Sequence, residues 1–163
     1  MTPAATKPKS AAVRMCGMDI RQADISAKPV LFREAKAWGR IMLKPETVKR
    51  VKEGRLEKGD ALAVSKTMAV VAAKSTPDML ALCHPLRIEG TRVEAKLNRD
   101  SIEVTVEVSA HEKTGVEMEA LTGVAIALLN IWDVVKAYEK DDKGQYPSTR
   151  IEEIRVLRKA KHE

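Results

Sequence analysis

Aromatic residues are scarce in this sequence, which contains one Phe, two Trp and two Tyr among 163 residues. A protein that binds single-stranded nucleic acid stacks successive bases on several aromatic side chains. Five aromatic residues spread along the chain do not supply such a platform, so the composition argues against a single-strand-binding protein. These residues are Phe32, Trp38, Trp132, Tyr138 and Tyr146.

Cysteine is also rare, and no metal or nucleotide motif accompanies it. Cys16 and Cys83 lie far apart, without a C-x-x-C pair or a series of cysteines and histidines. The sequence therefore encodes neither a disulfide framework nor a structural zinc site. It also lacks G-x-x-x-x-G-K-S/T and G-x-G-x-x-G, the phosphate-binding loops of the common nucleotide folds. We expect a reducing, cytoplasmic setting and no bound metal.

Long hydrophobic runs are missing as well. The longest nearly apolar run, at residues 123–132, is interrupted by Asn130 and falls short of the ~20 residues that a membrane-spanning helix needs. Residues 1–12 are rich in Pro, Ala, Thr and Lys and lack the apolar core of a signal peptide. We therefore expect a disordered leader at residues 1–18, with an alternative translation start at Met15 or Met18, and a single domain at residues 19–163.

The residues that are present fit one compact domain with a modest basic excess. Hydrophobic residues make up 44% of the chain and charged residues 32%, which is typical of a globular protein that folds without disulfides. The 29 Lys and Arg exceed the 23 Asp and Glu, giving a net charge of +6. This excess fits an anionic ligand but does not identify one.

Hydrophobic periodicity predicts the order strand, helix, strand, strand, helix, strand. The predicted elements are an extended segment at residues 30–43 with a bend at Gly39 and a second short strand at 40–43, a short helix at 47–53, a helix at 61–74 capped by Asp60, a hairpin of 87–97 and 101–110, a long helix at 118–139, and a strand at 150–157. This order is typical of the α+β class with a ferredoxin-like antiparallel sheet and both long helices on one face. Helical spacing predicts one apolar face on the long helix, made of Leu121, Val124, Ala125, Leu128, Trp132 and Val135. This helix carries more apolar surface than one sheet face needs, so we expect a homo-oligomer.

Asp133 and Lys136 interrupt the apolar stretch of the predicted long helix at spacing i, i+3, which places them on one side of it. An exposed helical ion pair worth ~0.3–0.5 kcal/mol is the common explanation for such a pair. Apolar neighbours on both sides instead favour a cleft or a subunit contact. There the two groups would titrate as a coupled unit suited to proton transfer. The residues alone leave both interpretations open.

Two other segments carry titratable side chains. Glu117 and Glu119 would point the same way on a strand and nearly opposite ways on a helix, where both would be first-turn acids. Pro85 keeps His84 out of helical geometry, so His84 either contacts a ligand from an extended turn or has a structural role. A Cys83–His84 pair alone gives little support to a zinc site.

Three cations accompany the predicted element ends. Arg33 lies on the first strand, Lys58 precedes the second helix, and Lys74 ends it. Such side chains can bind phosphates, although most surface lysines bind nothing specific.

Together these segments resemble the MoaC-type cyclic pyranopterin monophosphate synthases of molybdenum cofactor biosynthesis. The resemblance extends in order from about residue 24 to residue 157, and its most specific part is G-V-E-M-E-A-L followed by D-x-x-K. The matching segments are I-S-A-K at 25–28, R-E-A at 33–35, K-G-D at 58–60, L-C-H-P-L at 82–86, T-G-V-E-M-E-A-L-T at 114–122 and D-V-V-K-A at 133–137.

The resemblance implies a ferredoxin-like subunit in a hexamer of three dimers, with the active site between subunits. It implies a lyase that converts (8S)-3′,8-cyclo-7,8-dihydroguanosine 5′-triphosphate to cyclic pyranopterin monophosphate and releases pyrophosphate. No cofactor is implied, and assistance of Mg²⁺ with the phosphates stays open. The implied acid–base residues are Lys58, Asp133 and Lys136; the implied substrate contacts are Leu82, Cys83, His84, Glu117, Met118 and Glu119, with Arg33 and Lys74 on the triphosphate.

Two other classes of function fit part of the sequence. A ferredoxin-like module that binds RNA or a protein would explain the charge, but not a polar Asp133/Lys136 pair, and it would normally carry surface aromatics. An oligomeric scaffold would use the same pair as an ion pair between subunits. We expect a small-molecule substrate and neither nucleic acid nor a membrane as partner.

Overall fold

The computed structural model describes residues 20–162, so the leader predicted at residues 1–18 lies outside the described residues. Within them the predicted succession of strands and long helices is confirmed, and α3 is an additional turn of helix. The elements are β1 (Leu31–Met42), α1 (Pro45–Lys52), α2 (Ala61–Lys74), α3 (Thr76–Met79), β2 (Gly90–Leu97), β3 (Ser101–Glu112), α4 (Glu117–Glu139) and β4 (Arg150–His162).

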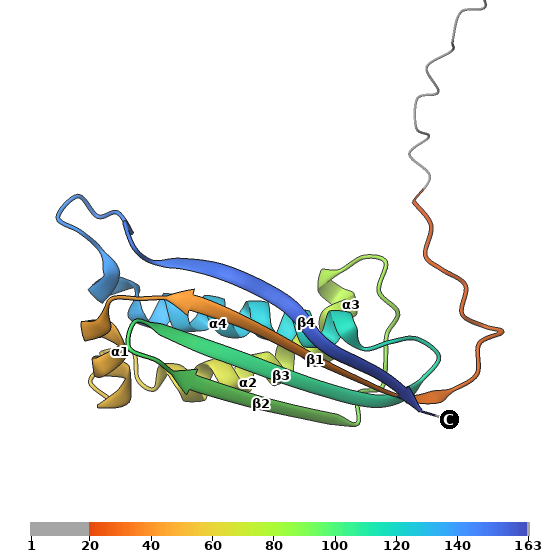
Figure 1. Ribbon diagram of the computed structural model, residues 1–163. Coiled ribbons are helices and arrows are strands. Elements are labelled where there is room, and N and C mark those ends of the chain that lie inside the picture. Colours follow the sequence, from red (N-terminus) through yellow and green to blue (C-terminus); the bar gives the residue numbers. More distant parts are fainter. Residues whose placement is uncertain (1–19, 163) are drawn as a thin grey trace, which may run out of the picture.

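The four strands form one antiparallel sheet in the order β2-β3-β1-β4. β1 pairs with β3 along its whole length and with β4 across two register shifts. The two long helices, α2 and α4, pack against each other on one side of the sheet (Figure 1). The predicted α+β architecture, with an antiparallel sheet and helices on one face, is confirmed.

The bend predicted at Gly39 is wrong, because β1 continues through this residue as one strand. Instead, Gly39 allows α4 to approach the sheet closely. A Cβ atom at this position would lie 2.7 Å from Val124 Cγ1, 2.9 Å from Leu128 Cδ1 and 2.8 Å from the Glu153 carbonyl oxygen. Real Cβ atoms do not make contacts this short, so the missing side chain lets α4 lie directly on the sheet.

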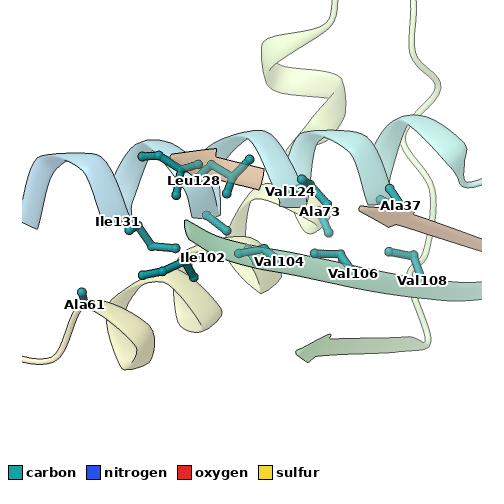
Figure 2. Packing of buried hydrophobic residues seen from close by; sticks show 14 of the residues in the cluster. Ala37, Ala61, Ala73, Ile102, Val104, Val106, Val108, Val124, Leu128 and Ile131 are labelled. Atoms are coloured by element: carbon teal, nitrogen blue, oxygen red, sulfur yellow. The ribbon is translucent and has the colours of Figure 1, made fainter. Parts of the chain in front are cut away.

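The hydrophobic core lies between the sheet and the two long helices (Figure 2). Small residues bring the helices together: a Cβ atom on Gly123 of α4 would lie 3.2 Å from the carbonyl oxygen of Ala69 on α2. The central residues of the core are Ala37, Ala61, Ala73, Ile102, Val104, Val106, Val108, Val124, Leu128 and Ile131.

α4 buries a different face from the one predicted. Of the six residues expected on its apolar face, Val124, Leu128 and Val135 are buried, whereas Leu121, Ala125 and Trp132 are half-buried. The buried face is rotated because α4 contacts α2 as well as β1 and β3. By length and composition alone α4 could also cross a membrane. Half of this apolar stretch is buried inside the domain, so packing of the core accounts for its apolar residues.

Local signals set the ends of most elements as predicted. Asp60 caps α2 by accepting hydrogen bonds from the backbone N–H groups of Leu62 at 2.8 Å and Ala63 at 3.0 Å. Gly54, at φ +66°, follows the last turn of α1. β4 is longer than the predicted 150–157, because residues 158–162 continue to pair with β1 beyond a bulge at Leu157.

Candidate functional site

α4 positions two groups of titratable side chains, one near each end. Glu117 and Glu119 lie in its first turn, and Asp133 and Lys136 lie in its last two turns. An α-helix rises about 1.5 Å per residue, so the distance along α4 from Glu119 to Asp133 is about 21 Å. Within one chain, these titratable residues of α4 therefore form two separate groups.

The lysine–aspartate cluster comprises Lys58, Asp133 and Lys136. Oδ1 of Asp133 lies 2.7 Å from Lys136 Nζ, and its Oδ2 accepts a hydrogen bond from Lys58 Nζ at 2.8 Å. Lys58 Nζ also donates to the backbone carbonyl of Asp133 at 3.0 Å. α4 supplies two of these groups on successive turns, and the loop before α2 supplies the third. The fold thus brings together the three residues to which the resemblance assigns acid–base catalysis.

Two ammonium groups control the titration of this cluster. Hydrogen bonds from Lys136 and Lys58 lower the pKa of Asp133 to about 2, and the hydrogen bond to Asp133 raises the pKa of Lys136. Near neutral pH Asp133 is therefore ionised and Lys136 is protonated. The cleft expected around this pair is not formed by one chain alone, since the Asp133 side chain is 56% exposed. The cluster is open to a ligand or to a second subunit.

The Glu119 cluster, at the other end of α4, comprises Glu119 and the nearby Cys83, and His84 follows Cys83 directly in the chain. Glu119 is only 3% exposed, and its Oε2 has no hydrogen-bond partner within the described part of the chain. Burial raises the pKa of Glu119, and the nearby Glu117 adds to this effect. Burial also raises the pKa of the Cys83 thiol, again with a contribution from Glu119. A buried carboxyl with a free oxygen is a group suited to binding a polar ligand or exchanging a proton.

His84 is held in an extended turn, as Pro85 predicts. Its Nε2 lies 2.8 Å from the carbonyl oxygen of Ala23. A carbonyl oxygen only accepts hydrogen bonds, so Nε2 is a ring nitrogen that carries a proton in this contact. Gln22 Nε2 donates to the carbonyl oxygen of Cys83 at 3.0 Å. The segment before β1 therefore fixes the position of His84 and the proton on its Nε2.

Glu117 and Glu119 adopt the helical one of the two predicted conformations and reach different surroundings. Glu119 points into the protein, whereas Glu117 accepts a hydrogen bond from Lys159 Nζ of β4 at 2.8 Å. Burial is the largest single influence on Glu117 and opposes its ionisation. The hydrogen bond from Lys159, the backbone N–H of Glu117 and the charges of Lys159 and Arg33 together outweigh it and keep the pKa of Glu117 below its ordinary value. Glu117 therefore belongs to the surface that faces β4.

A cavity of about 850 Å³ opens beside Glu117. Its lining includes the first residues of β1 and the last residues of β4, which lie side by side at one end of the sheet (Figure 1). Met118 also lines this cavity, and cations outnumber carboxylates around it. Several ammonium and guanidinium groups around one open cavity fit a polyanionic ligand. The charged residues of this cationic cavity are Lys28, Arg33, Lys113, Lys159 and Lys161, with Glu34 and Glu117.

Lys159 and Lys161 were not predicted as site residues. The apolar alternation ends at residue 157, so the sequence presents them as a basic tail. In the structure they belong to β4, and pairing with β1 places Lys161 opposite Arg33. A basic segment directly after a predicted strand could have indicated these two site residues. The sequence pattern does not show which strand this segment pairs with.

Lys74 and Leu82 lie outside the cationic cavity. Lys74 lines a smaller cavity of about 200 Å³ together with Ile88 and Glu89, so one chain does not bring it beside Arg33. Leu82 is exposed on the turn that leads to Cys83. Among residues 20–162, no three His, Cys, Asp or Glu side chains gather in an arrangement that could hold a metal ion.

Comparison with known proteins assigns the family. The MoaC family model matches residues 22–162. A protein of Pyrococcus horikoshii named probable cyclic pyranopterin monophosphate synthase is 56% identical over 142 residues, covering 87% of this chain and 89% of that protein. A protein of the same name from Pyrococcus furiosus is 53% identical over 144 residues, covering 88% and 92%. A Methanothermobacter thermautotrophicus protein named probable cyclic pyranopterin monophosphate synthase accessory protein is 49% identical over 144 residues, covering 88% and 91%. The chain belongs to the MoaC family.

Proposed function

We propose that this chain is a cyclic pyranopterin monophosphate synthase, a lyase of molybdenum cofactor biosynthesis. Its substrate is (8S)-3′,8-cyclo-7,8-dihydroguanosine 5′-triphosphate, and its products are cyclic pyranopterin monophosphate and pyrophosphate. The observation that carries the proposal is an acid–base cluster and a cationic cavity positioned by the same helix in a member of this family. The reaction needs both, because it moves protons during ring rearrangement and it binds a triphosphate.

The lysine–aspartate cluster supplies the proton transfers. Opening a ring requires a proton donor for the departing atom, and closing one requires a base for the attacking group. Lys136 is a protonated amine near neutral pH, held by Asp133 at 2.7 Å. After donating its proton, the same amine can act as a base in the following step. Asp133 stays ionised and keeps both lysine side chains in place.

The cationic cavity binds the triphosphate. Closure of the cyclic phosphate forms a bond between a substrate hydroxyl oxygen and the α-phosphorus and breaks the bond from that phosphorus to the bridging oxygen. The hydroxyl proton passes to a base, and pyrophosphate leaves with the electron pair of the broken bond. Arg33 and Lys159 line the cavity and stabilise the negative charge of the leaving pyrophosphate.

A second copy of the chain completes the site. The two clusters are about 21 Å apart along α4, too far to act on one small substrate. A two-fold axis that crosses α4 at Ile126 would pair two antiparallel α4 helices. It would place Asp133 of one copy opposite Glu119 of the other, because each lies seven residues from Ile126. Each subunit of such a dimer contributes one cluster to each site.

The outer surface of the helices supports this arrangement. Met118 and Leu129 of α4 are 42% and 52% exposed, although both are large and apolar. Thr122 and Ala125 lie between them at helical spacing, and such small residues permit close approach of a second helix. Val71 of the neighbouring α2 is also exposed. Apolar surface of this kind is what a homo-oligomer covers.

Further features of the enzyme belong to the same proposal. The succession β-α-β-β-α-β with the sheet order β2-β3-β1-β4 supports a ferredoxin-like subunit. Three of the proposed dimers assemble into a hexamer. The enzyme is a single domain at residues 19–163 after an N-terminal leader, works in the cytoplasm and carries no resident cofactor. Any Mg²⁺ that assists the reaction enters with the phosphates of the substrate.

The proposal is tested with the purified protein and the cyclised GTP substrate. We expect cyclic pyranopterin monophosphate and pyrophosphate in equal amounts, measured by mass spectrometry and by a coupled phosphate assay. Binding of the substrate without turnover would overturn the proposed enzyme and favour a binding role. Pyrophosphate release without the pterin product would overturn the proposed reaction while leaving the cationic cavity as the phosphate site.

A further inference from the structure

Tyr138 connects the end of α4 to the loop that carries Lys58. Its hydroxyl oxygen accepts a hydrogen bond from the backbone N–H of Glu57 at 3.1 Å, although the two residues are 81 positions apart. Glu57 directly precedes Lys58 in the loop. The hydrogen bond therefore fixes the backbone next to a lysine whose Nζ lies 2.8 Å from Asp133 Oδ2.

The loop around Lys58 depends on such an anchor. Residues 57–60 are exposed, so core packing does not hold them. Gly59 has φ +95°, a conformation that glycine adopts readily, and glycine also has the greatest backbone freedom. On the far side of Gly59, Asp60 is bound to the first turn of α2. Lys58 is thus fixed on one side by the α2 cap and on the other by Tyr138.

Tyr138 is itself firmly held. The Arg50 guanidinium carbon lies 4.9 Å from the centre of its ring, within the range of a cation–π contact. Its backbone carbonyl accepts a hydrogen bond from Lys44 Nζ at 3.3 Å. The next residue, Glu139, is fully buried and accepts a hydrogen bond from the backbone N–H of Lys44 at 3.1 Å. The Tyr138 hydroxyl group is therefore presented to the loop by a rigid support.

We propose that Tyr138 is a positioning residue: its hydroxyl group holds the Glu57–Lys58 backbone so that Lys58 Nζ stays within hydrogen-bond distance of Asp133. The inference rests on the proposed function, because Tyr138 acts through a residue of the lysine–aspartate cluster. A displacement of about 1 Å in a catalytic group can reduce turnover by up to about 10²-fold. A single hydrogen bond to an exposed loop can thus have a large effect on turnover and a small one on folding.

The test is the Tyr138→Phe variant, which keeps the ring and its contact with Arg50 but loses the hydroxyl group. We expect kcat to fall about tenfold, with KM within about twofold and an almost unchanged melting temperature. Hydrogen exchange at the Glu57 amide should become faster, because its acceptor is gone. The matched control is Glu57→Ala, which keeps the backbone N–H that binds Tyr138 and should retain the wild-type kcat and melting temperature.

A Lys58→Ala background separates positioning from general structural support. Because Tyr138 acts through Lys58, adding Tyr138→Phe to this background should not lower kcat further. Equal losses in both backgrounds, an unchanged kcat in the single variant, or unchanged Glu57 exchange would each overturn the role of Tyr138. Failure of the proposed function gives a different result, since the wild-type protein itself would then show no turnover. That result would also overturn the positioning role of Tyr138 in catalysis, whatever the exchange data show.

Discussion

Lys58 Nζ lies 2.8 Å from Asp133 Oδ2, although 75 residues separate them along the chain. The contact joins the loop before α2 to the last two turns of α4. Lys136 Nζ occupies the other carboxylate oxygen at 2.7 Å, so one aspartate organises two ammonium groups. All three side chains are about half exposed, so their ion pairs contribute little to folding. We therefore propose that this cluster serves binding and catalysis rather than folding.

Removal of either Asp133 or Lys136 should affect turnover much more than folding. Lys136→Ala removes the proposed general acid and base, and Asp133→Asn removes the carboxylate that holds it. Each variant should lower kcat by at least about 10²-fold. Melting temperature and oligomeric state should change little. Pyrophosphate release, thermal unfolding and sedimentation measure these quantities. The double substitution should cost hardly more than either single one, because groups that act as a unit are not additive.

The matched control is Arg92→Ala, which removes an exposed ion pair with Glu94 on the sheet. It should leave turnover and melting temperature unchanged. If the Asp133–Lys136 ion pair instead stabilises a subunit contact, the two variants should affect assembly and folding more than turnover. The oligomer would then loosen and the melting temperature fall by several degrees, with activity lost only as far as assembly is lost. Full turnover in either single variant would contradict the acid–base assignment.

The alkaline limb of the pH profile should depend on Asp133. The hydrogen bond to Asp133 raises the pKa of Lys136 above its ordinary 10.5, so its ammonium group persists to higher pH. Asp133→Asn removes the negative charge, so the pKa of Lys136 should fall and the alkaline limb of kcat/KM should move to lower pH. The shift in the pKa of Lys136 is measured from the pH dependence of the residual activity or from an NMR titration of Lys136 Nζ. The pKa of Asp133 is about 2, so this residue should produce no acid limb above about pH 4.

Subunits that carry different defects should restore activity when mixed. We consider Glu119→Gln, which damages the Glu119 cluster, and Asp133→Asn, which damages the lysine–aspartate cluster. If each site combines one cluster from each of two subunits, a mixed dimer contains one site without any substitution. After subunit exchange, an equal mixture should recover about a quarter of the wild-type activity, since half of the dimers are mixed and half of their sites are intact.

Mixing Asp133→Asn with Lys136→Ala provides the control. Both substitutions damage the same cluster, so no combination of subunits creates an intact site and no activity should return. Recovery in this control would exclude the proposed division of the site. Absence of recovery in the Glu119→Gln and Asp133→Asn mixture, with subunit exchange verified, would show that each site is built within a single chain.

Glu119→Gln should stabilise the protein near neutral pH while reducing turnover. Burial raises the pKa of Glu119 above its ordinary 4.5. Below pH 4.5 the folded and the unfolded chain both hold this proton. As the pH rises from 4.5 through the raised folded-state pKa, the unfolded chain releases the proton first, so wild-type stability decreases. The advantage of the glutamine variant should therefore be absent near pH 4 and greatest above the raised pKa, as measured by thermal unfolding over this range. A difference in melting temperature that does not vary with pH would contradict ionisation of the buried carboxyl.

Gly39→Ala should destabilise the fold by about 1–3 kcal/mol, because the new Cβ overlaps with Val124, Leu128 and a backbone oxygen. For a chain of this size that loss corresponds to a decrease of roughly 2–4 °C in melting temperature per kcal/mol. Gly115→Ala is the comparison, because the three atoms nearest to its Cβ position all belong to the flexible Glu117 side chain. A wild-type melting temperature in Gly39→Ala would show that α4 can move away from β1 at little cost.

The sequence by itself determined the elements that depend on near neighbours. The cap on α2 joins Asp60 to residues two and three positions away. The hairpin of β2 and β3 closes through a hydrogen bond from the Asn98 N–H to the Ser101 carbonyl oxygen. The alternation of β3 and the pairing of Asp133 with Lys136 follow from strand and helix periods. Such interactions act within a few residues, so composition and spacing are enough to predict them.

Tertiary structure alone decided the features that join distant segments. Gly39 looked like a bend because the closeness of α4 to β1 is invisible in its local sequence. Lys159 and Lys161 looked like a tail because only pairing of β4 with β1 brings them to Arg33 and the cationic cavity. Glu117 and Glu119 are two residues apart, yet packing buries Glu119, whose Oε2 has no hydrogen-bond partner among residues 20–162, whereas Glu117 accepts a hydrogen bond from Lys159. Sheet register and helix packing depend on how the whole core is filled. They decide which side chains are buried, where cavities form and which distant residues form hydrogen bonds. The spacing of residues along the chain does not contain this information.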